Sequence, residues 1–216
     1  MLSHRRRLFL LPAGVAALAL AGCAVGDDGP STTQTRDVGA FTRIDNRDSV
    51  DVQLHVGEPQ SVRVRAGEKV IDDVRTVVRD GALQVTFDHH GFGSGDVVIE
   101  ASVPKLTGIE ASGSGDIDAK YIDADTFEVR SDGSADITLD GTTNRLSVDL
   151  DGSGDADLGQ LEAREAHVTV GGSGDADVQA NQRLEVALDG SGDVRYHGDP
   201  ALTRRVDGSG DLSRAD

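Results

Sequence analysis

The sequence predicts an all-β chain that winds into a single-stranded parallel β-helix, a solenoid with coils of about 18–20 residues. The first observation is the tetrapeptide Gly-Ser-Gly-Asp, whose copies begin at Gly93, Gly113, Gly152, Gly172, Gly190 and Gly208. Gly133 opens the near-copy Gly-Ser-Ala-Asp. The second is the alternation of apolar and polar residues on both sides of each copy. The third is the absence of Trp, with 3% aromatic residues, which favours a thin core of Val, Leu, Ile and Ala.

Residues 1–22 have the features of a bacterial lipoprotein signal peptide. Three arginines, Arg5 to Arg7, precede an apolar run that is too short for a comfortable membrane span. The segment Leu20-Ala21-Gly22-Cys23 resembles the lipobox, in which the cysteine is acylated and becomes the new N-terminus. We therefore expect Cys23, the only cysteine, to be the lipid attachment site. The alternative is a cleaved secretory signal that happens to contain a cysteine.

The charge of the chain restricts its partners. Cleavage before Cys23 would remove three of the 21 basic residues and none of the 38 acidic ones, changing the formal net charge from −17 to −20. Such a chain should repel nucleic acid and anionic lipid, so no nucleic-acid partner is expected. Residues 23–36 are rich in Gly, Ser, Thr and Asp without periodicity, which predicts a flexible tether. One folded domain is expected over residues 37–216.

The first part of this domain mostly precedes the tetrapeptides and is expected to supply the opening coils and a cap. The alternation predicts strands at 41–44, 50–56 and 61–65, with a turn at Gly57-Glu58-Pro59-Gln60. A short helical turn is expected near 70–75. Two further apolar segments, 74–78 and 83–87, flank Asp80-Gly81 and predict a hairpin.

Each later coil should contain a strand, a glycine corner and a second strand. In one coil, Leu146, Val148 and Leu150 alternate before the corner, and Ala156 and Leu158 alternate after it. Glycine is expected at the corner because it reaches backbone angles that a Cβ forbids. Successive coils should pair in parallel, ~4.8 Å apart, with right-handed crossovers and with the motif serines in a column. An up-and-down barrel is the main alternative, but it should show hairpin turns twice as often.

The domain resembles the head GIN domain of putative auto-transporter adhesins. The similarity rests on Phe41-x-x-Ile44-x-Asn46, Val50-Asp51-Val52, Gly57-Glu58, the segment Asp80 to Val85, and the Gly-Ser-Gly-Asp coils. It covers about residues 37–216. The resemblance implies a β-helical domain on a secreted or lipid-anchored bacterial protein, and it supplies no catalytic residues. No membrane β-barrel follows the head in this sequence, so the resemblance implies attachment through Cys23.

Two columns of aspartates form the candidate site. The motif aspartates are Asp96, Asp116, Asp136, Asp155, Asp175, Asp193 and Asp211; Asp118, Asp157 and Asp177 follow two residues after a motif aspartate. Both columns should point outward, because the residues between them alternate inward. Clustered carboxylates favour a cation or a basic partner. The alternative is that each aspartate accepts backbone N–H bonds at its own corner and is otherwise solvated.

Other chemistry finds little support in the sequence. The calcium-binding nonapeptide repeat needs an aspartate where Ala176 stands, and the period here gives one motif per coil. The pair His89-His90 has no third ligand at a recognisable spacing and is interpreted as a polar loop. The glycine motifs lack the lysine of a phosphate-binding loop. No cofactor or metal is therefore expected.

The sequence predicts a non-catalytic protein, lipid-anchored on the extracytoplasmic side of the bacterial envelope. Its β-helix would serve as an adhesive, binding or scaffolding module, with another envelope protein or a surface glycan as partner. A carbohydrate-active β-helix enzyme is one alternative; few basic residues, no aromatic platform and coils of constant length argue against it. An accessory protein for envelope assembly or stress is the other. The oligomeric state is left open.

Overall fold

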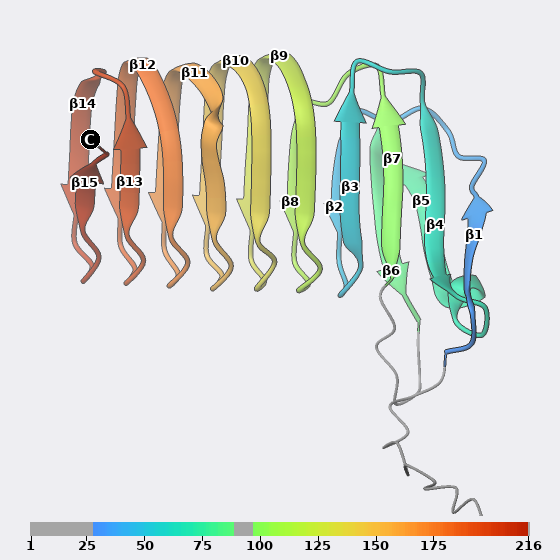
Figure 1. The fold of residues 1–216 in the computed structure, drawn as a ribbon. Helices are drawn as coiled ribbons and strands as arrows, with labels where there is room; N and C mark the ends of the chain where they lie inside the picture. The colour runs from blue at the N-terminus through green and yellow to red at the C-terminus, as the bar shows by residue number, and fades with distance from the viewer. Residues whose placement is uncertain (1–27, 89–96, 216) are drawn as a thin grey trace, which may run out of the picture.

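The computed structural model describes residues 28–88 and 97–215, and in them the chain forms a parallel β-solenoid of about five turns with an antiparallel N-terminal extension (Figure 1). The strands are β1 (Ser31–Thr35), β2 (Arg43–Asn46), β3 (Asp51–Val56), β4 (Ser61–Gly67), β5 (Val74–Arg79), β6 (Ala82–Phe87), β7 (Val98–Val103), β8 (Gly108–Ala111), β9 (Ile117–Ser131), β10 (Ile137–Leu150), β11 (Ala156–Val170), β12 (Ala176–Leu188), β13 (Val194–His197), β14 (Ala201–Val206) and β15 (Leu212–Arg214). The short 3-10 helix η1 covers Ile71–Asp73. The predicted fold class is confirmed.

Each coil has two straight sides joined by a tight corner and a wide bend. Strands β9 to β12 run up one side, bend over the upper edge and descend the other side, while the tetrapeptide corners lie along the lower edge (Figure 1). The start of β9 therefore pairs with β3, with Ile117 opposite Val52. Its end pairs with β8, with Val129 opposite Ile109. All pairings among β8 to β15 are parallel, as the constant repeat length predicts.

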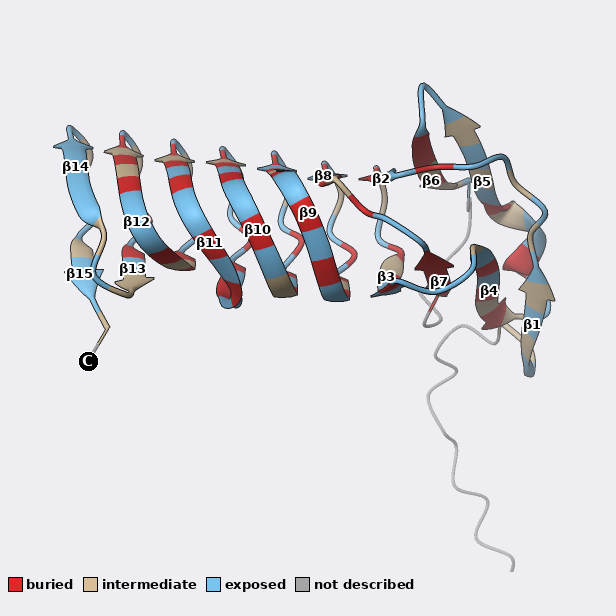
Figure 2. Ribbon diagram, turned by 90° about the horizontal axis from the view of Figure 1, so that it is seen from above, coloured by how far each residue is buried: buried red, intermediate tan, exposed pale blue. Residues whose placement is uncertain are grey.

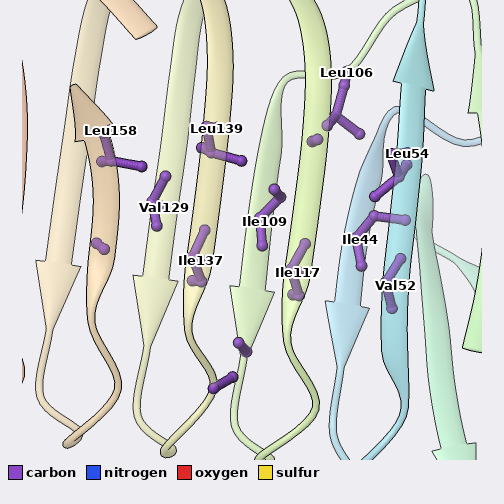
Figure 3. Packing of buried hydrophobic residues seen from close by; sticks show 14 of the residues in the cluster. Ile44, Val52, Leu54, Leu106, Ile109, Ile117, Val129, Ile137, Leu139 and Leu158 are labelled. Carbon is purple, nitrogen blue, oxygen red and sulfur yellow. The ribbon is translucent and has the colours of Figure 1, made fainter. Parts of the chain in front are cut away.

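The core is a narrow column of aliphatic side chains between the two sides. Val52, Ile117 and Ile137 occupy successive coils at one level and are all at most 1% exposed (Figure 3). Bands of buried residues alternate with exposed ones along β9 to β12 (Figure 2), because successive side chains of a strand point to opposite faces. Phe127 is the largest of the fully buried side chains. The low aromatic content of the sequence thus agrees with the narrowness of this core.

The N-terminal region builds coils in an order that differs from the order of the chain. Along one side of the solenoid the sequence of strands is β1-β4-β7-β3-β9, and along the other it is β5-β6-β2-β8. The coil made by β6 and β7 thus stacks on the far side of the coil made by β2 and β3, away from β8 and β9. Strands β1, β4 and β5 add antiparallel pairs at this end. The expected opening coils and cap are present, with the order of the two coils as the unexpected feature.

The local predictions for this region agree with the structure, with one exception. The hairpin β5–β6 turns at Asp80 and Gly81, whose φ angles of 50° and 74° belong to the left-handed region. Helix η1 lies where a helical turn was expected. The prediction of a flexible tether is wrong for residues 31–35, because β1 pairs antiparallel with β4 over its full length. The five residues of β1 are all polar, so the sequence shows no alternation of apolar and polar residues that would indicate a strand there.

The reason for glycine at the tetrapeptide corner is also corrected. None of the described motif glycines has a positive φ angle, so their backbone angles are open to other residues. A Cβ built on Gly172, however, would lie 1.9 Å from the carbonyl oxygen of Gly152, and one on Gly152 would lie 1.9 Å from that of Gly133. Glycine is therefore required by the close approach of one corner backbone to the next.

Candidate binding surface

The tetrapeptide corners stack directly on one another through backbone hydrogen bonds. From Ser134 to Ser209, the N–H of each motif serine donates to the carbonyl oxygen of the first motif glycine of the preceding coil; Ser134 bonds to Gly113 at 2.9 Å and Ser173 to Gly152 at 2.9 Å. The serine side chains are exposed and form the expected column. The corner edge therefore presents a regular row of hydroxyls, with each coil in register with the last.

The motif aspartates form a second ladder beside these serines. From Asp116 to Asp193, one carboxylate oxygen of each motif aspartate accepts the backbone N–H of the motif aspartate in the next coil, at 2.7–3.1 Å. We call the exposed row Asp116, Asp136, Asp155, Asp175, Asp193 and Asp211 the acidic ridge. The expectation that each aspartate caps its own corner is therefore wrong in its geometry. The side chain points along the solenoid axis, so the donor nearest to it belongs to the neighbouring coil.

The residue that begins this ladder is Asp51, which the sequence pattern did not indicate. Asp51 Oδ1 accepts the N–H of Asp116 at 3.0 Å, although Asp51 belongs to no tetrapeptide. Beside it, the buried Asn46 donates from Nδ2 to the carbonyl oxygens of Val50, at 2.7 Å, and Gly115, at 3.2 Å. An alignment of Asp51-Val52 with Asp116-Ile117 would have revealed the first of these roles. Asn46 and Asp51, two of the residues that carry the family resemblance, thus join the corner between β2 and β3 to the tetrapeptide corner that begins at Gly113.

The second aspartate column is less regular than predicted. Asp157 and Asp177 are direct neighbours in the parallel pairing of β11 and β12. Thr138 separates Asp157 from Asp118, and Arg195 follows Asp177 in the next coil. His197 Nε2 lies 2.7 Å from Asp177 Oδ1. The structure therefore brings together two members of this column and leaves Asp118 apart.

The two columns together line a shallow acidic hollow of about 290 Å³ on this face. Asp155, Asp157, Asp175, Asp177 and Asp193 contribute carboxylates, and Arg195 contributes one cation. Within residues 28–88 and 97–215, no three histidine, cysteine or acidic side chains converge as a metal site requires. Carboxylates arranged in this way attract basic groups by their charge.

Arginines neutralise part of the acidic surface away from the ridge. Arg205 donates to Asp189 and Asp207, and these two carboxylates raise the pKa of the guanidinium. At the opposite edge, the hydrogen bond from Asn144 and then the charge of Arg145 lower the pKa of Asp125. Among the described residues, no arginine or lysine forms a salt bridge with a ridge aspartate. The ridge is therefore a regular row of carboxylates that are bonded to backbone N–H groups and not to cations.

Several predicted residues lie outside the described part of the chain. These are the signal peptide, Cys23, the pair His89-His90 and Asp96. In the ranges that the structure does describe, no helix is long and apolar enough to span a membrane.

The fold and the corner ladders define a parallel β-solenoid domain. Its repeating unit is a coil of about 18–20 residues that contains one tetrapeptide corner. The chain belongs to the family of the putative auto-transporter adhesin head GIN domain, whose sequence model matches residues 40–200. The adhesin family suggests that the protein is located at the cell surface or outside the cell. No curated protein sequence matches the chain.

Solved structures support the fold. A putative adhesin from Bacteroides fragilis is 21% identical, with a TM-score of 0.70 over 86% of this chain and 97% of that one. A putative lipid binding protein from Parabacteroides distasonis is 21% identical, with a TM-score of 0.56 over 87% and 98% of the two chains. A putative adhesin from Parabacteroides merdae is 16% identical, with a TM-score of 0.52 over 87% and 97%. The names of the family and of these neighbours are not those of enzymes.

Proposed function

We propose that the protein is a non-catalytic adhesive or binding module, anchored by lipid at Cys23 on the extracytoplasmic side of the envelope. The observation that carries this proposal is the acidic ridge, in which backbone hydrogen bonds fix a row of exposed carboxylates at one per coil. A rigid row binds a repetitive or extended partner through many weak contacts at once, at little entropic cost to the protein.

The partner that suits the ridge is a basic segment of another envelope protein or cell-surface polymer. The ridge repels polyanions, so nucleic acids and acidic polysaccharides are poor ligands. The described surface hollows measure about 230–330 Å³, at or below the lower end of the range for small-molecule pockets. Binding of a partner across the open surface accounts for both the charged ridge and the small size of the hollows, and it requires no catalytic cleft. The names of the family and of its solved neighbours support the same class of function.

A charge-matched pair of variants tests the role of the ridge. In the ridge variant, Asp136, Asp155, Asp175 and Asp193 become Asn, which keeps an oxygen to accept the next N–H but removes four charges. In the control, four exposed or half-exposed acids elsewhere lose their charge: Asp123→Asn, Asp149→Asn, Glu162→Gln and Glu165→Gln. We expect the ridge variant to lose binding to intact cells and to amine-bearing beads, and the control to retain most of it.

The measurement is the amount of protein retained, with calcium and with a chelator at fixed ionic strength. Equal losses in the two variants would show that only net charge matters and would overturn the role of the ridge. Binding that requires calcium would replace the basic partner by a bridging cation. Chemical turnover of a polysaccharide by the wild-type protein would contradict the non-catalytic proposal as a whole.

A further inference from the structure

A tyrosine at the upper edge of the solenoid is exposed in an unfavourable backbone conformation. Tyr121 is 64% exposed, and its φ angle of 65° lies in the left-handed region. That conformation interrupts the alternation of β9, so that Lys120 and Tyr121 both face outward while Ile122 returns to the core. In the described part of the chain, Tyr121 is the one tyrosine, phenylalanine or tryptophan ring that is mostly exposed.

The position is a β-bulge at which a smaller residue would be expected. Between the paired positions Ala119–Leu139 and Ile122–Gly141, β9 has two residues where β10 has only Asp140. The N–H of Tyr121 donates to Asp140 Oδ1 at 3.1 Å. Left-handed backbone is favourable for glycine and tolerable for asparagine, but it is an outlier for a bulky side chain. Bulges often re-aim a side chain toward a functional site, and retained strain marks such places.

The tyrosine ring stands next to a polar hollow on β3, β4 and β7. Its neighbour is His55, with ring centroids 6.2 Å apart and planes inclined by 39°. His55 also lines a hollow of about 230 Å³, whose walls carry Gln53, Glu58, Arg63 and Glu100. Arg63 donates to Glu100 at 3.2 Å. The aromatic ring, the imidazole and the hollow therefore form one continuous stretch of surface.

The side chains of the hollow present hydrogen-bond donors and acceptors together. Gln53 offers both, Arg63 only donates, and the two glutamates only accept when ionised. Glu100 already pairs with Arg63 and Arg65, so this carboxylate is not free for a cationic ligand. An anionic ligand would be repelled by Glu58 and by the net charge of the protein. A flat apolar ring beside such a mixture suits an uncharged ring that bears hydroxyl groups. The volume is smaller than that of a drug-sized pocket, so a single sugar unit of a longer glycan is the expected occupant.

We propose that Tyr121, His55 and the adjoining hollow form a binding subsite for a neutral sugar residue, with the face of the sugar packed on the tyrosine ring. The inference rests on the proposed function in that it gives a binding module its ligand. It uses a different surface from the acidic ridge. The ridge can therefore fail while this subsite stands, and the reverse also holds.

The test is titration of the full-length protein, held in detergent, with the methyl glycosides of glucose, galactose and mannose, with methyl glucosaminide and with methyl glucuronide. We expect saturable binding of at least one neutral glycoside, and at least tenfold weaker binding of the aminated and carboxylated sugars. Tyr121→Gly should abolish this binding while raising the melting temperature, because glycine relieves the backbone strain. Tyr121→Phe, which keeps the ring, should bind within about twofold of the wild type, as should the adjacent control Lys120→Ala.

Three results would overturn the proposal. The first is the absence of saturation by any neutral glycoside. The second is a preference for the aminated or carboxylated sugar. The third is unchanged binding in Tyr121→Gly. Loss of stability in Tyr121→Gly would separately show that the ring is needed by the fold. Retention on cells by the ridge, measured on the same proteins, distinguishes failure of this subsite from failure of the proposed function.

Discussion

At the scale of single residues, glycines serve two different physical purposes in this chain. Gly81 has a φ angle of 74° and open space where its Cβ would be, so its backbone conformation selects glycine. Gly172 has an ordinary backbone, and its missing Cβ makes room for the carbonyl oxygen of Gly152. The near-copy at Gly133 has Ala135 at its third position, which shows that the second glycine of the motif is replaceable in at least one coil. The first glycine is therefore the stricter requirement.

Substitution by asparagine should separate the two purposes. Asparagine tolerates left-handed backbone, so Gly81→Asn should cost less than about 1 kcal/mol of unfolding free energy. Gly172→Asn and Gly172→Ala should each cost roughly 1–3 kcal/mol or more, because the added atoms force the corners apart. Urea denaturation measures both, with the exposed Ser173→Ala as a control near zero. Equal costs at Gly81 and Gly172 would contradict the distinction.

At the scale of elements, the last coil differs from those before it. Strand β14 pairs with β12, which places Leu202, Arg204 and Val206 opposite Leu184, Val186 and Leu188. Leu202 and Val206 are 39% and 42% exposed, and no further strand covers them among the described residues. An arginine between two exposed apolar residues opposes stacking of another molecule on this edge, as charges do on other edge strands.

Arg204→Val should therefore increase association. The substitution completes an apolar row on β14, and we expect light scattering to rise with protein concentration more steeply than in the wild type. Thr203→Val is the matched control, because Thr203 lies on the same strand and alternates to the opposite face. If the two variants scatter alike, position 204 has no special role in keeping this edge apart.

At the scale of the whole molecule, the repeat length and alternation were sufficient to predict the solenoid, because each coil repeats the same local pattern. The spatial order of the first coils was not predictable in this way. No sequence pattern in residues 41–103 indicates that the coil of β6 and β7 stacks on the far side of the coil of β2 and β3. The candidate aspartates were found from their period, yet their partners were not, since a side chain's direction along the axis leaves no periodic signal. The exposure of Tyr121 depended on a single dihedral angle that the sequence does not encode visibly.

The envelope attachment is a prediction that follows from Cys23 alone. Cys23→Ala should prevent acylation and release the protein from the membrane fraction, while the purified variant keeps the circular dichroism of a β protein. The measurement is the protein's distribution after a carbonate wash and centrifugation. A variant that still sediments with membranes would exclude the lipobox as the anchor.

The corner aspartates join each coil to the next along the solenoid. Amide hydrogen exchange, followed by NMR, tests this role most directly. In the wild type, the N–H of Asp175 should be protected by Asp155 Oδ1, to which it donates at 2.8 Å. Asp155→Ala should raise the exchange rate of the Asp175 amide selectively, and Asp155→Asn should restore most of the protection. An unchanged rate at Asp175, with faster exchange at the corner of Asp155 itself, would contradict the claim.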